Sequence, residues 1–557
     1  MPTESAQRTF ENTTSSDGNE RVTEPQHREN STIGAPVEVI NPLGTNVSFL
    51  SAVLLPLSRM IGMGVYSTPG VVLESVGSIG VAFVLWTIGS LVAFSGLNLY
   101  IELASRFPKR SGGDAVFLEQ AYPRPPYMVA TSFAVCTTML GSTAINATVF
   151  AQYTMHALDI AVTSSRQKSL AVAMVTLALG LCSISTRISL KVMGTLGIVK
   201  IGSMAFVILT GFAVLSGMTR IEHPIANLKH PFAGSILNAN ALATGVLKID
   251  YTFVGWREAV NFLAEVHTKQ SASNSSIAPG INLVRRASFT ALSLASMIFL
   301  FINLAYFAAV PKETLKSSGS LVGAMFCESV YGKDSFIALR LFPILVALSC
   351  VGGLIASTLG QARIVRETAR QGVLPYSEFL SSTWPFGTPA GPIMIQWTLS
   401  VLVIVVPPAG DAFNFLINLH TYPFFVFAVL SALAVWVLRA RSPLLPSQTF
   451  RAWNGFVFIY LAKCILTLIM PWVPPKATSY PGGSKLWYAT YCAVGLGIVL
   501  LSGVYYFTWM FVLPRWGGYE IVQETIVLDG GASTNCFKKV PKREYQDEDD
   551  STPLLRD

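Results

Sequence analysis

Charged and helix-breaking residues interrupt the first long apolar stretch of this sequence. It contains "SRMIGMGVYSTPG" at residues 58–70, in which Arg59 precedes two glycines and a proline. An ionisable side chain at mid-depth in a membrane costs about 2.5–3.5 kcal/mol on insertion scales, so it should face a cavity or a partner. Unwound backbone at that depth is tolerated only where it is buried in protein or lines a cavity. This stretch is therefore a candidate functional site.

A second interrupted stretch, "GVLKIDYTFVGWREAVNFLAEV" at residues 245–266, carries charged residues on both sides of Gly255. They are Lys248, Asp250, Arg257 and Glu258, and we expect Lys248, Asp250 and Glu258 to form a buried charge network with Arg59. Lys248 and Asp250 are two residues apart and point to different faces of a helix, so they are not a simple pair. Arg59 lies just inside the first break and Glu258 just inside the second. We expect these two to form an ion pair, with Asp250 as the alternative partner for Arg59.

The chemistry that such breaks offer is the binding of a zwitterion. A half-helix that starts near Gly64 would present free N–H groups and a positive dipole end, which suit a carboxylate. Carbonyl groups of the unwound turns would accept an ammonium. Paired breaks in matching positions of two halves are typical of a transporter site. The alternative interpretation is that the glycines only let membrane helices pack closely.

The elements that must position these residues are membrane-spanning helices. The chain has 557 residues, 51% of them hydrophobic and 13% charged, with a mean hydropathy of +0.50. About twelve apolar stretches are long enough to cross roughly 30 Å of hydrocarbon as helices, and too long for barrel strands. The predicted fold is therefore an all-α membrane protein. The expected spans are 48–73, 78–104, 126–157, 169–186, 192–217, 238–266, 287–310, 336–359, 389–407, 411–438, 453–474 and 488–513.

Three parts follow from this pattern. Residues 1–46 form a polar, disordered tail without the features of a signal peptide, residues 47–515 form the transmembrane domain, and residues 516–557 form a second tail. Basic residues favour loops on the side of both tails, so we expect both termini to be cytoplasmic. The same loops account for the net charge of +8, so nucleic acid is not an expected partner. The expected location is the plasma membrane, with endosomal or vacuolar membrane as the alternative.

Other chemistries find no support in the residue pattern. The seven cysteines are scattered singly, which indicates neither a disulfide framework nor a metal site. We find no nucleophile–base arrangement and no phosphate-binding loop. An enzyme, a cofactor and a bound metal are therefore not expected.

Several motifs in a fixed order resemble one family over roughly residues 46–515. They are "SRMIGMGVYSTPG", "GSIGVAFVLWTIG", "YIELASRFPKRSGGDAVFLEQAYP", "GIVKIGSMAF", "YTFVGW" with "NFLAEV", and "ARIVRETARQGVLP". The sequence resembles the L-type amino acid transporter branch of the amino acid–polyamine–organocation superfamily, nearest its fungal methionine permeases. The resemblance implies a LeuT-type inverted repeat of five plus five helices with two more, helices 1 and 6 interrupted, and alternating access.

The resemblance also implies site residues. The positions that match the family's substrate site are Ile61, Gly62, Met63, Gly64, Tyr251, Thr252, Phe253 and Gly255. The first four would offer backbone groups to the substrate carboxylate, whereas residues 251–253 would contact its ammonium and form an outer gate. Met63 stands where the family usually has serine or threonine. Its thioether would narrow the pocket, so the resemblance does not determine the identity of the substrate.

A lysine on the fifth helix is the expected ion-coupling residue. Lys200 matches the lysine whose amine, in proton-coupled members, takes the place of a sodium ion. The alternative is that Lys200 snorkels toward the inner interface. The expected function is proton-coupled import of amino acids, neutral ones with methionine as a candidate. The alternatives are an uncoupled exchanger and a transporter-like nutrient sensor. Besides the amino acid, protons and membrane lipid are the expected partners.

Two further partner predictions come from the loops and tails. Relatives that travel with a glycoprotein heavy subunit carry a cysteine between helices 3 and 4, and "DIAVTSSRQKSL" here has none, so no disulfide-linked subunit is expected. The terminal tails contain lysine at Lys538, Lys539 and Lys542, where ubiquitin could attach. Asp550 followed by Leu554 and Leu555 resembles an acidic dileucine signal for sorting adaptors, although a solvated acidic tail is the alternative.

Overall fold

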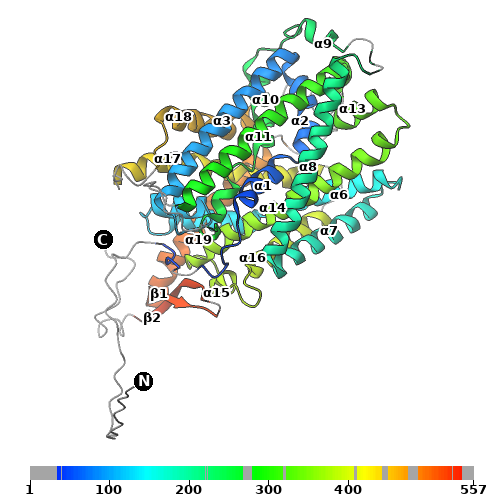
Figure 1. Cartoon of the computed structure of the whole chain (residues 1–557). Coiled ribbons are helices and arrows are strands. Elements are labelled where there is room, and N and C mark those ends of the chain that lie inside the picture. The colour runs from blue at the N-terminus through cyan, green and yellow to red at the C-terminus, as the bar shows by residue number, and fades with distance from the viewer. Residues whose placement is uncertain are drawn as a thin grey trace, which may run out of the picture. The chain divides into compact units, whose positions relative to one another are not determined.

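A computed structural model of the chain describes residues 34–38, 41–219, 221, 224–267, 279–317, 322–406, 411–441, 450–474, 487, 489–529 and 531–541. Within these ranges the protein is a bundle of helices with one β-hairpin (Figure 1). Nine described segments are long and apolar enough to cross a membrane, and the shorter apolar helices α1 (Phe49–Met60) and α16 (Ala390–Val405) accompany them. The predicted all-α membrane fold is confirmed.

Most predicted spans correspond to single helices. These are α3 (Ile79–Arg106), α7 (Ser164–Ile184), α8 (Thr186–Leu215), α11 (Pro279–Ala309), α14 (Phe342–Arg370), α16, α17 (Asp411–Arg441), α18 (Asn454–Ile469) and α19 (Thr490–Phe507). A short π-helix, η2 (Ile337–Leu341), precedes α14, and a short 3-10 helix, η3 (Met470–Trp472), follows α18. A short π-helix, η4 (Thr508–Val512), and α20 (Leu513–Gly517) continue α19. The short helices are α4 (Asp114–Ala121), α9 (Ala226–Lys229), α12 (Lys312–Ser317), α13 (Val322–Tyr331) and α15 (Ser377–Ser381).

The first and sixth spans are interrupted, as predicted. The first consists of α1 and α2 (Met63–Val76), with Gly62 in extended conformation at φ −121°, ψ −154° between them. The sixth consists of α10 (Ala239–Phe253) and the 3-10 helix η1 (Glu258–Glu265), separated by a turn at Gly255 with φ +134°. Pro69 lies inside α2 and does not end it. Proline is tolerated there because neighbouring helices can satisfy the freed carbonyl.

The third span is also interrupted, which was not predicted from the sequence. Its two halves are α5 (Met128–Leu140) and α6 (Ala144–Ala157). Side chains of other helices replace the lost helical hydrogen bonds: the Thr143 N–H donates to Ser400 Oγ at 3.0 Å, and Gln361 Nε2 donates to the Thr137 carbonyl at 3.0 Å. The break is therefore supported by α14 and α16.

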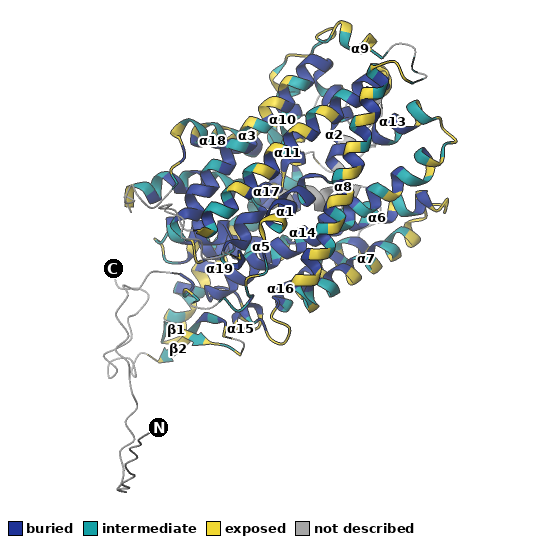
Figure 2. Ribbon diagram, in the orientation of Figure 1, coloured by how far each residue is buried: buried dark blue, intermediate teal, exposed yellow. Residues whose placement is uncertain are grey.

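The interior of the bundle is built around α1 and α14. Helix α1 packs on α8, α11 and α14, and α14 also packs on α6 and α8. Exposed residues form stripes on α3, α8 and α11, whose other faces are buried (Figure 2). On α8, Gly211 allows close approach to α11, because a Cβ there would lie 2.2 Å from the Ala305 Cβ.

The two ends of the described chain meet at one end of the bundle. The hairpin of β1 (Tyr519–Val527) and β2 (Ser533–Pro541) lies beside α15, at the end opposite α9 (Figure 1). Asn535 Nδ2 donates to the Gly34 carbonyl at 2.8 Å. Termini on the same side require an even number of crossings, in agreement with about twelve.

Both regions assigned to tails therefore contain ordered segments. On the N-terminal side, the Ala35 N–H donates to Glu119 Oε1 at 2.6 Å, and Glu38 pairs with Arg366 at 2.5 Å and with Arg370 at 3.4 Å. The ordered chain thus begins before residue 47, because these contacts compensate the entropy of ordering it. On the C-terminal side, Lys538 and Lys539 lie on β2, whereas Lys542, Asp550, Leu554 and Leu555 fall outside the described residues.

Glu38→Gln is expected to destabilise the protein by about 1.5–3 kcal/mol, the range for hydrogen bonds to charged groups. Glu38 is nearly buried between the two arginines, with a side-chain exposure of 8%. The measurement is thermal unfolding of the purified protein in detergent. Glu313→Gln is the matched control, because Glu313 is 80% exposed in its pair with Lys316 and should change stability little. Equal unfolding temperatures for the two variants would contradict this assignment.

Candidate functional site

A cavity of about 260 Å³ lies where the three interrupted helices meet. Its walls come from the α1–α2, α5–α6 and α10–η1 breaks and from α4, α14, α17 and α18. Representative residues of the three breaks are Gly62, Gly64, Thr143, Asn146, Thr252 and Gly255. Its place at interrupted helices is typical of a solute-binding site.

The first break exposes helix ends to this cavity. Gly62 has no side chain that could cap α2, and the first N–H groups of a helix lack intrahelical partners. Gly62 and Gly64 both line the cavity, so this end of α2 suits an anion such as a carboxylate. On the α1 side, the Ile61 carbonyl accepts a hydrogen bond from Ser349 Oγ at 3.1 Å.

The two main breaks are in direct contact. A Cβ on Gly64 would lie 3.1 Å from Thr252 Oγ1, and a Cβ on Gly255 would lie 2.8 Å from the Arg59 Cβ. Thr252 Oγ1 also donates to Thr68 Oγ1 at 3.0 Å, which joins α10 to α2. Glycine is required at 255 for its positive φ as well as for this close approach.

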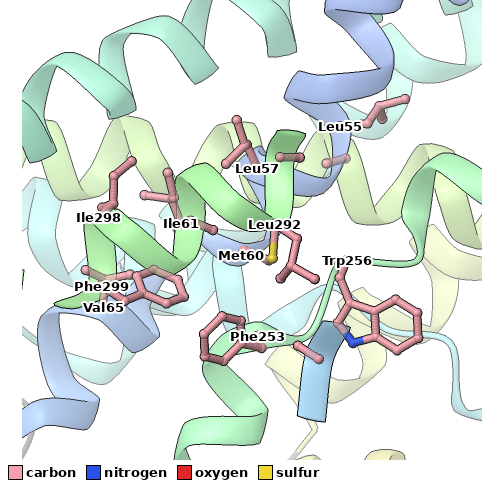
Figure 3. Packing of buried hydrophobic residues seen from close by; sticks show 14 of the residues in the cluster. Leu55, Leu57, Met60, Ile61, Val65, Phe253, Trp256, Leu292, Ile298 and Phe299 are labelled. Carbon is pink, nitrogen blue, oxygen red and sulfur yellow. The ribbon is translucent and has the colours of Figure 1, made fainter. Parts of the chain in front are cut away.

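Five of the eight positions expected to bind substrate line the cavity. They are Gly62, Gly64, Tyr251, Thr252 and Gly255. The side chains of Ile61 and Phe253 instead lie in the apolar core (Figure 3). The Phe253 ring centroid is 5.0 Å from that of Phe299. Phe253 thus lies outside the cavity wall in this structure, because residues 251 and 253 point to different faces of α10. The side chain of Met63 is outside the described residues.

The expected ion pair between Arg59 and Glu258 is present. Arg59 Nη1 lies 2.7 Å from Glu258 Oε1, and Asn261 Nδ2 donates to Glu258 Oε2 at 3.2 Å. Gly360 on α14 leaves room for this carboxylate, because a Cβ there would lie 2.0 Å from Glu258 Oε2. The pair links α1 to the start of η1 beside the cavity.

The other charges on the sixth span are arranged differently from the prediction. Asp250 pairs with Lys463 of α18 at 2.8 Å and not with Arg59. Lys248, expected in the buried network, is exposed, and the structure places it neither in the cavity wall nor in an ion pair with any described residue. The two-residue offset from Asp250 turns Lys248 to another face of α10, so it does not belong to the network.

A third ion pair involves an acidic residue that was not predicted as part of the site. Arg257 lies 3.0 Å from Asp114 Oδ2, at the start of α4, and both residues line the cavity. Asp114 Oδ1 accepts hydrogen bonds from the Tyr100 hydroxyl at 2.5 Å and from Ser431 Oγ at 2.9 Å.

Lys463, the partner of Asp250, was also not predicted as a site residue. The sequence does contain a signal for it, since it is a single lysine within an apolar span.

Lys200 belongs to α8, and its side chain reaches the C-terminal end of α1 behind the cavity wall. Its exposure is 2%, and Nζ donates to the Ser58 carbonyl at 2.6 Å. A Cβ on Gly353, which lines the cavity, would lie 3.8 Å from this Nζ. The C-terminal carbonyls of a helix carry its negative dipole end and attract a cation. This buried position does not fit a lysine that snorkels to the interface.

Metal chemistry has no obvious ligand set in the described part of the chain. Among those residues, no group of three or more His, Cys, Asp or Glu side chains is placed to hold a metal ion. The polar part of the site consists of backbone groups at the breaks, ion pairs and uncharged side chains such as Thr143, Asn146 and Gln361.

Fold and site together define a multi-pass membrane protein with a solute cavity at interrupted helices. The family model for amino acid permeases matches residues 47–499. This chain belongs to the amino acid permease family, and its members are transporters and not enzymes.

Curated relatives cover most of the chain. It is 30% identical over 495 residues to the high-affinity methionine permease of Saccharomyces cerevisiae, covering 87% of this chain and 82% of the relative. The low-affinity methionine permease of the same yeast is 23% identical over 511 residues, covering 89% and 88%. The human large neutral amino acids transporter small subunit 2 is 26% identical over 473 residues, covering 84% and 80%.

Proposed function

We propose that this permease imports neutral amino acids, methionine among them, by proton-coupled alternating access. The observation that carries the proposal is the uncapped start of α2 at a cavity also lined by the α10–η1 turn. The first N–H groups of α2 would bind the substrate carboxylate, and carbonyls of the turn before Gly255 would bind its ammonium. Tyr251 and Thr252 line the cavity beside that turn.

The charge balance of the cavity supports a neutral substrate. Three ion pairs lie in or beside its wall: Arg59 with Glu258, Arg257 with Asp114, and Lys463 with Asp250. Each charge is compensated by its partner, so these pairs add no net charge that would select a cationic or anionic side chain.

Apolar residues in the cavity wall support methionine as a candidate. Phe133, Ile145, Val254, Phe424 and Phe425 offer apolar surface to a flexible thioether side chain. Two of the curated relatives are named as methionine permeases, which agrees with this composition. A competition assay with the twenty amino acids against labelled methionine, in transporter-deficient cells, tests the substrate. Failure of every neutral amino acid to compete would refute the proposal.

Lys200 is the proposed coupling residue, because its amine is buried against the Ser58 carbonyl at the first break. Loss of its proton would remove the charge that strengthens this hydrogen bond and so loosen the contact between α8 and α1. Lys200→Ala is expected to abolish the acceleration of uptake by an inward proton gradient while sparing exchange. Proteoliposomes with an imposed pH gradient and no internal substrate measure the first, and preloaded proteoliposomes measure the second.

The matched control is Lys191→Ala, on the same helix but exposed. It should retain gradient-driven uptake. Full gradient-driven accumulation by Lys200→Ala would remove Lys200 from the coupling mechanism. A wild-type protein that ignores the gradient but exchanges substrate would be the uncoupled exchanger, and one that binds without measurable flux would be the sensor.

We place the protein in the plasma membrane with both termini in the cytoplasm and without a disulfide-linked subunit. The meeting of Gly34 with Asn535 supports a common side for the termini, and basic loop residues support the cytoplasmic side. The loop between α6 and α7 contains no cysteine. Ubiquitin and sorting adaptors at the C-terminal tail remain part of this proposal.

A further inference from the structure

The ion pair between Asp250 and Lys463 joins two helices that lie far apart in the sequence. Asp250 is near the end of α10, and Lys463 is in the middle of α18. Asp250 Oδ2 lies 2.8 Å from Lys463 Nζ, and the side chains are 20% and 13% exposed. The Lys463 Nζ also lies 5.5 Å from the ring centroid of Tyr460.

This ion pair is part of the cavity wall. Asp250 and Lys463 line the same cavity as Gly62 and Gly64. Asp250 belongs to α10, the helix that also supplies Thr252 to this wall. The pair is therefore on the α10 side of the break that receives the substrate in the proposed function.

We propose that Lys463 determines substrate charge specificity, by compensating Asp250 so that the cavity accepts neutral amino acids and excludes cationic ones. This inference rests on the proposed function. The chain sets a carboxylate beside the substrate-binding break, where an unpaired carboxylate would itself bind the side-chain ammonium of a cationic amino acid. Lys463 occupies that position with an ammonium supplied by the protein.

The physical basis is the strength of charge interactions away from bulk water. Two opposite charges a few ångströms apart interact several times more strongly in a partly buried site than in water. Removing one member of such a pair leaves the other charge unpaired and destabilised. An opposite charge that binds beside it then stabilises it. A substrate that brings that counter-ion gains affinity relative to one that does not.

The alternative explanation is that the pair only joins α18 to α10. A purely structural pair predicts that its loss lowers the transport of all substrates by the same factor. A specificity pair predicts that the ratio between substrates changes, and in opposite directions for the two partners. The ratio of uptake rates separates the two explanations.

The test uses the full-length protein and three labelled probes: methionine, lysine and glutamate. In Lys463→Met, which keeps the length of the side chain without its charge, lysine uptake relative to methionine should rise about tenfold or more. In Asp250→Asn, glutamate uptake relative to methionine should rise, while lysine stays excluded. The double variant Asp250→Asn, Lys463→Met has neither charge, so it should transport methionine and exclude both lysine and glutamate.

Lys248→Met is the matched control, because Lys248 is on α10 but exposed and outside the cavity wall. It should leave both ratios unchanged. The proposal is overturned if Lys463→Met transports methionine with an unaltered lysine ratio. If Lys463→Met does not reach the membrane, an unaltered glutamate ratio in Asp250→Asn overturns it. A wild-type protein that transports no neutral amino acid would instead refute the proposed function.

Discussion

Replacing Gly64 with leucine is expected to reduce amino acid uptake to background. Even a Cβ at this position would lie 3.1 Å from Thr252 Oγ1 and 3.3 Å from its Cγ2, which is tighter than an ordinary contact. The larger side chain must therefore separate α2 from α10 or extend over the N–H groups that would bind the carboxylate. Uptake of labelled methionine in transporter-deficient cells, normalised to surface protein, measures the loss.

Gly62→Leu separates blockage of the site from misfolding. Gly62 lines the same cavity, but a Cβ there meets only the Arg59 carbonyl oxygen, at 3.6 Å, and its φ of −121° suits any residue. This variant should fold normally and still lose uptake. Gly180→Leu on α7 is the control, because a Cβ there has nothing within 4 Å. Normal uptake by correctly delivered Gly62→Leu would exclude a substrate site at this break.

The positions of two breaks could be predicted from sequence because glycine and charge occur together there. Gly62 follows Arg59 closely, and Gly255 comes just before Arg257 and Glu258, so neither segment fits an uninterrupted apolar helix. The third break was missed, since the small and polar residues that surround it carry no charge. What stabilises that break is remote, because its hydrogen bonds come from side chains on α14 and α16.

Partners of the buried charges were only partly predictable. Arg59 and Glu258 both lie just inside their breaks, so contact between the breaks brings them together. The partners of Asp250 and Arg257 come from α18 and from the start of α4, and only the packing of those elements around α10 places them there. Periodicity along one helix contains no information on such contacts.

The ordered ends of the chain were missed for a related reason. An isolated two-stranded hairpin is marginally stable in water, so its sequence alone does not indicate an ordered element. Here Tyr127 supports it, with its hydroxyl donating to Gln523 Oε1 at 2.6 Å and its ring 5.4 Å from that of Phe537. The Arg370 Nε donates to the Ser533 carbonyl at 2.9 Å. Order in this region depends on the helices beneath it.

Loss of Arg59 is expected to be more harmful than loss of Glu258, although they form one ion pair. The Glu258 side chain is 6% exposed, whereas that of Arg59 is 28% exposed and lines the cavity. Arg59→Met leaves a buried carboxylate without its cation, and breaking a buried pair in this way costs about 3–5 kcal/mol. Glu258→Gln leaves an arginine that can reach the cavity, and a glutamine oxygen can still accept from Asn261.

A double-mutant cycle measures this asymmetry. Arg59→Met should nearly abolish uptake and lower the unfolding temperature, and Glu258→Gln should reduce both by a smaller amount. The double variant should recover part of the uptake and stability that Arg59→Met loses, because both charges are then absent. Arg166→Met, an exposed residue on α7, controls for the loss of a positive charge. Equal losses in both single variants, with no recovery in the double variant, would show that the two side chains act independently and that their ion pair does not hold the breaks together.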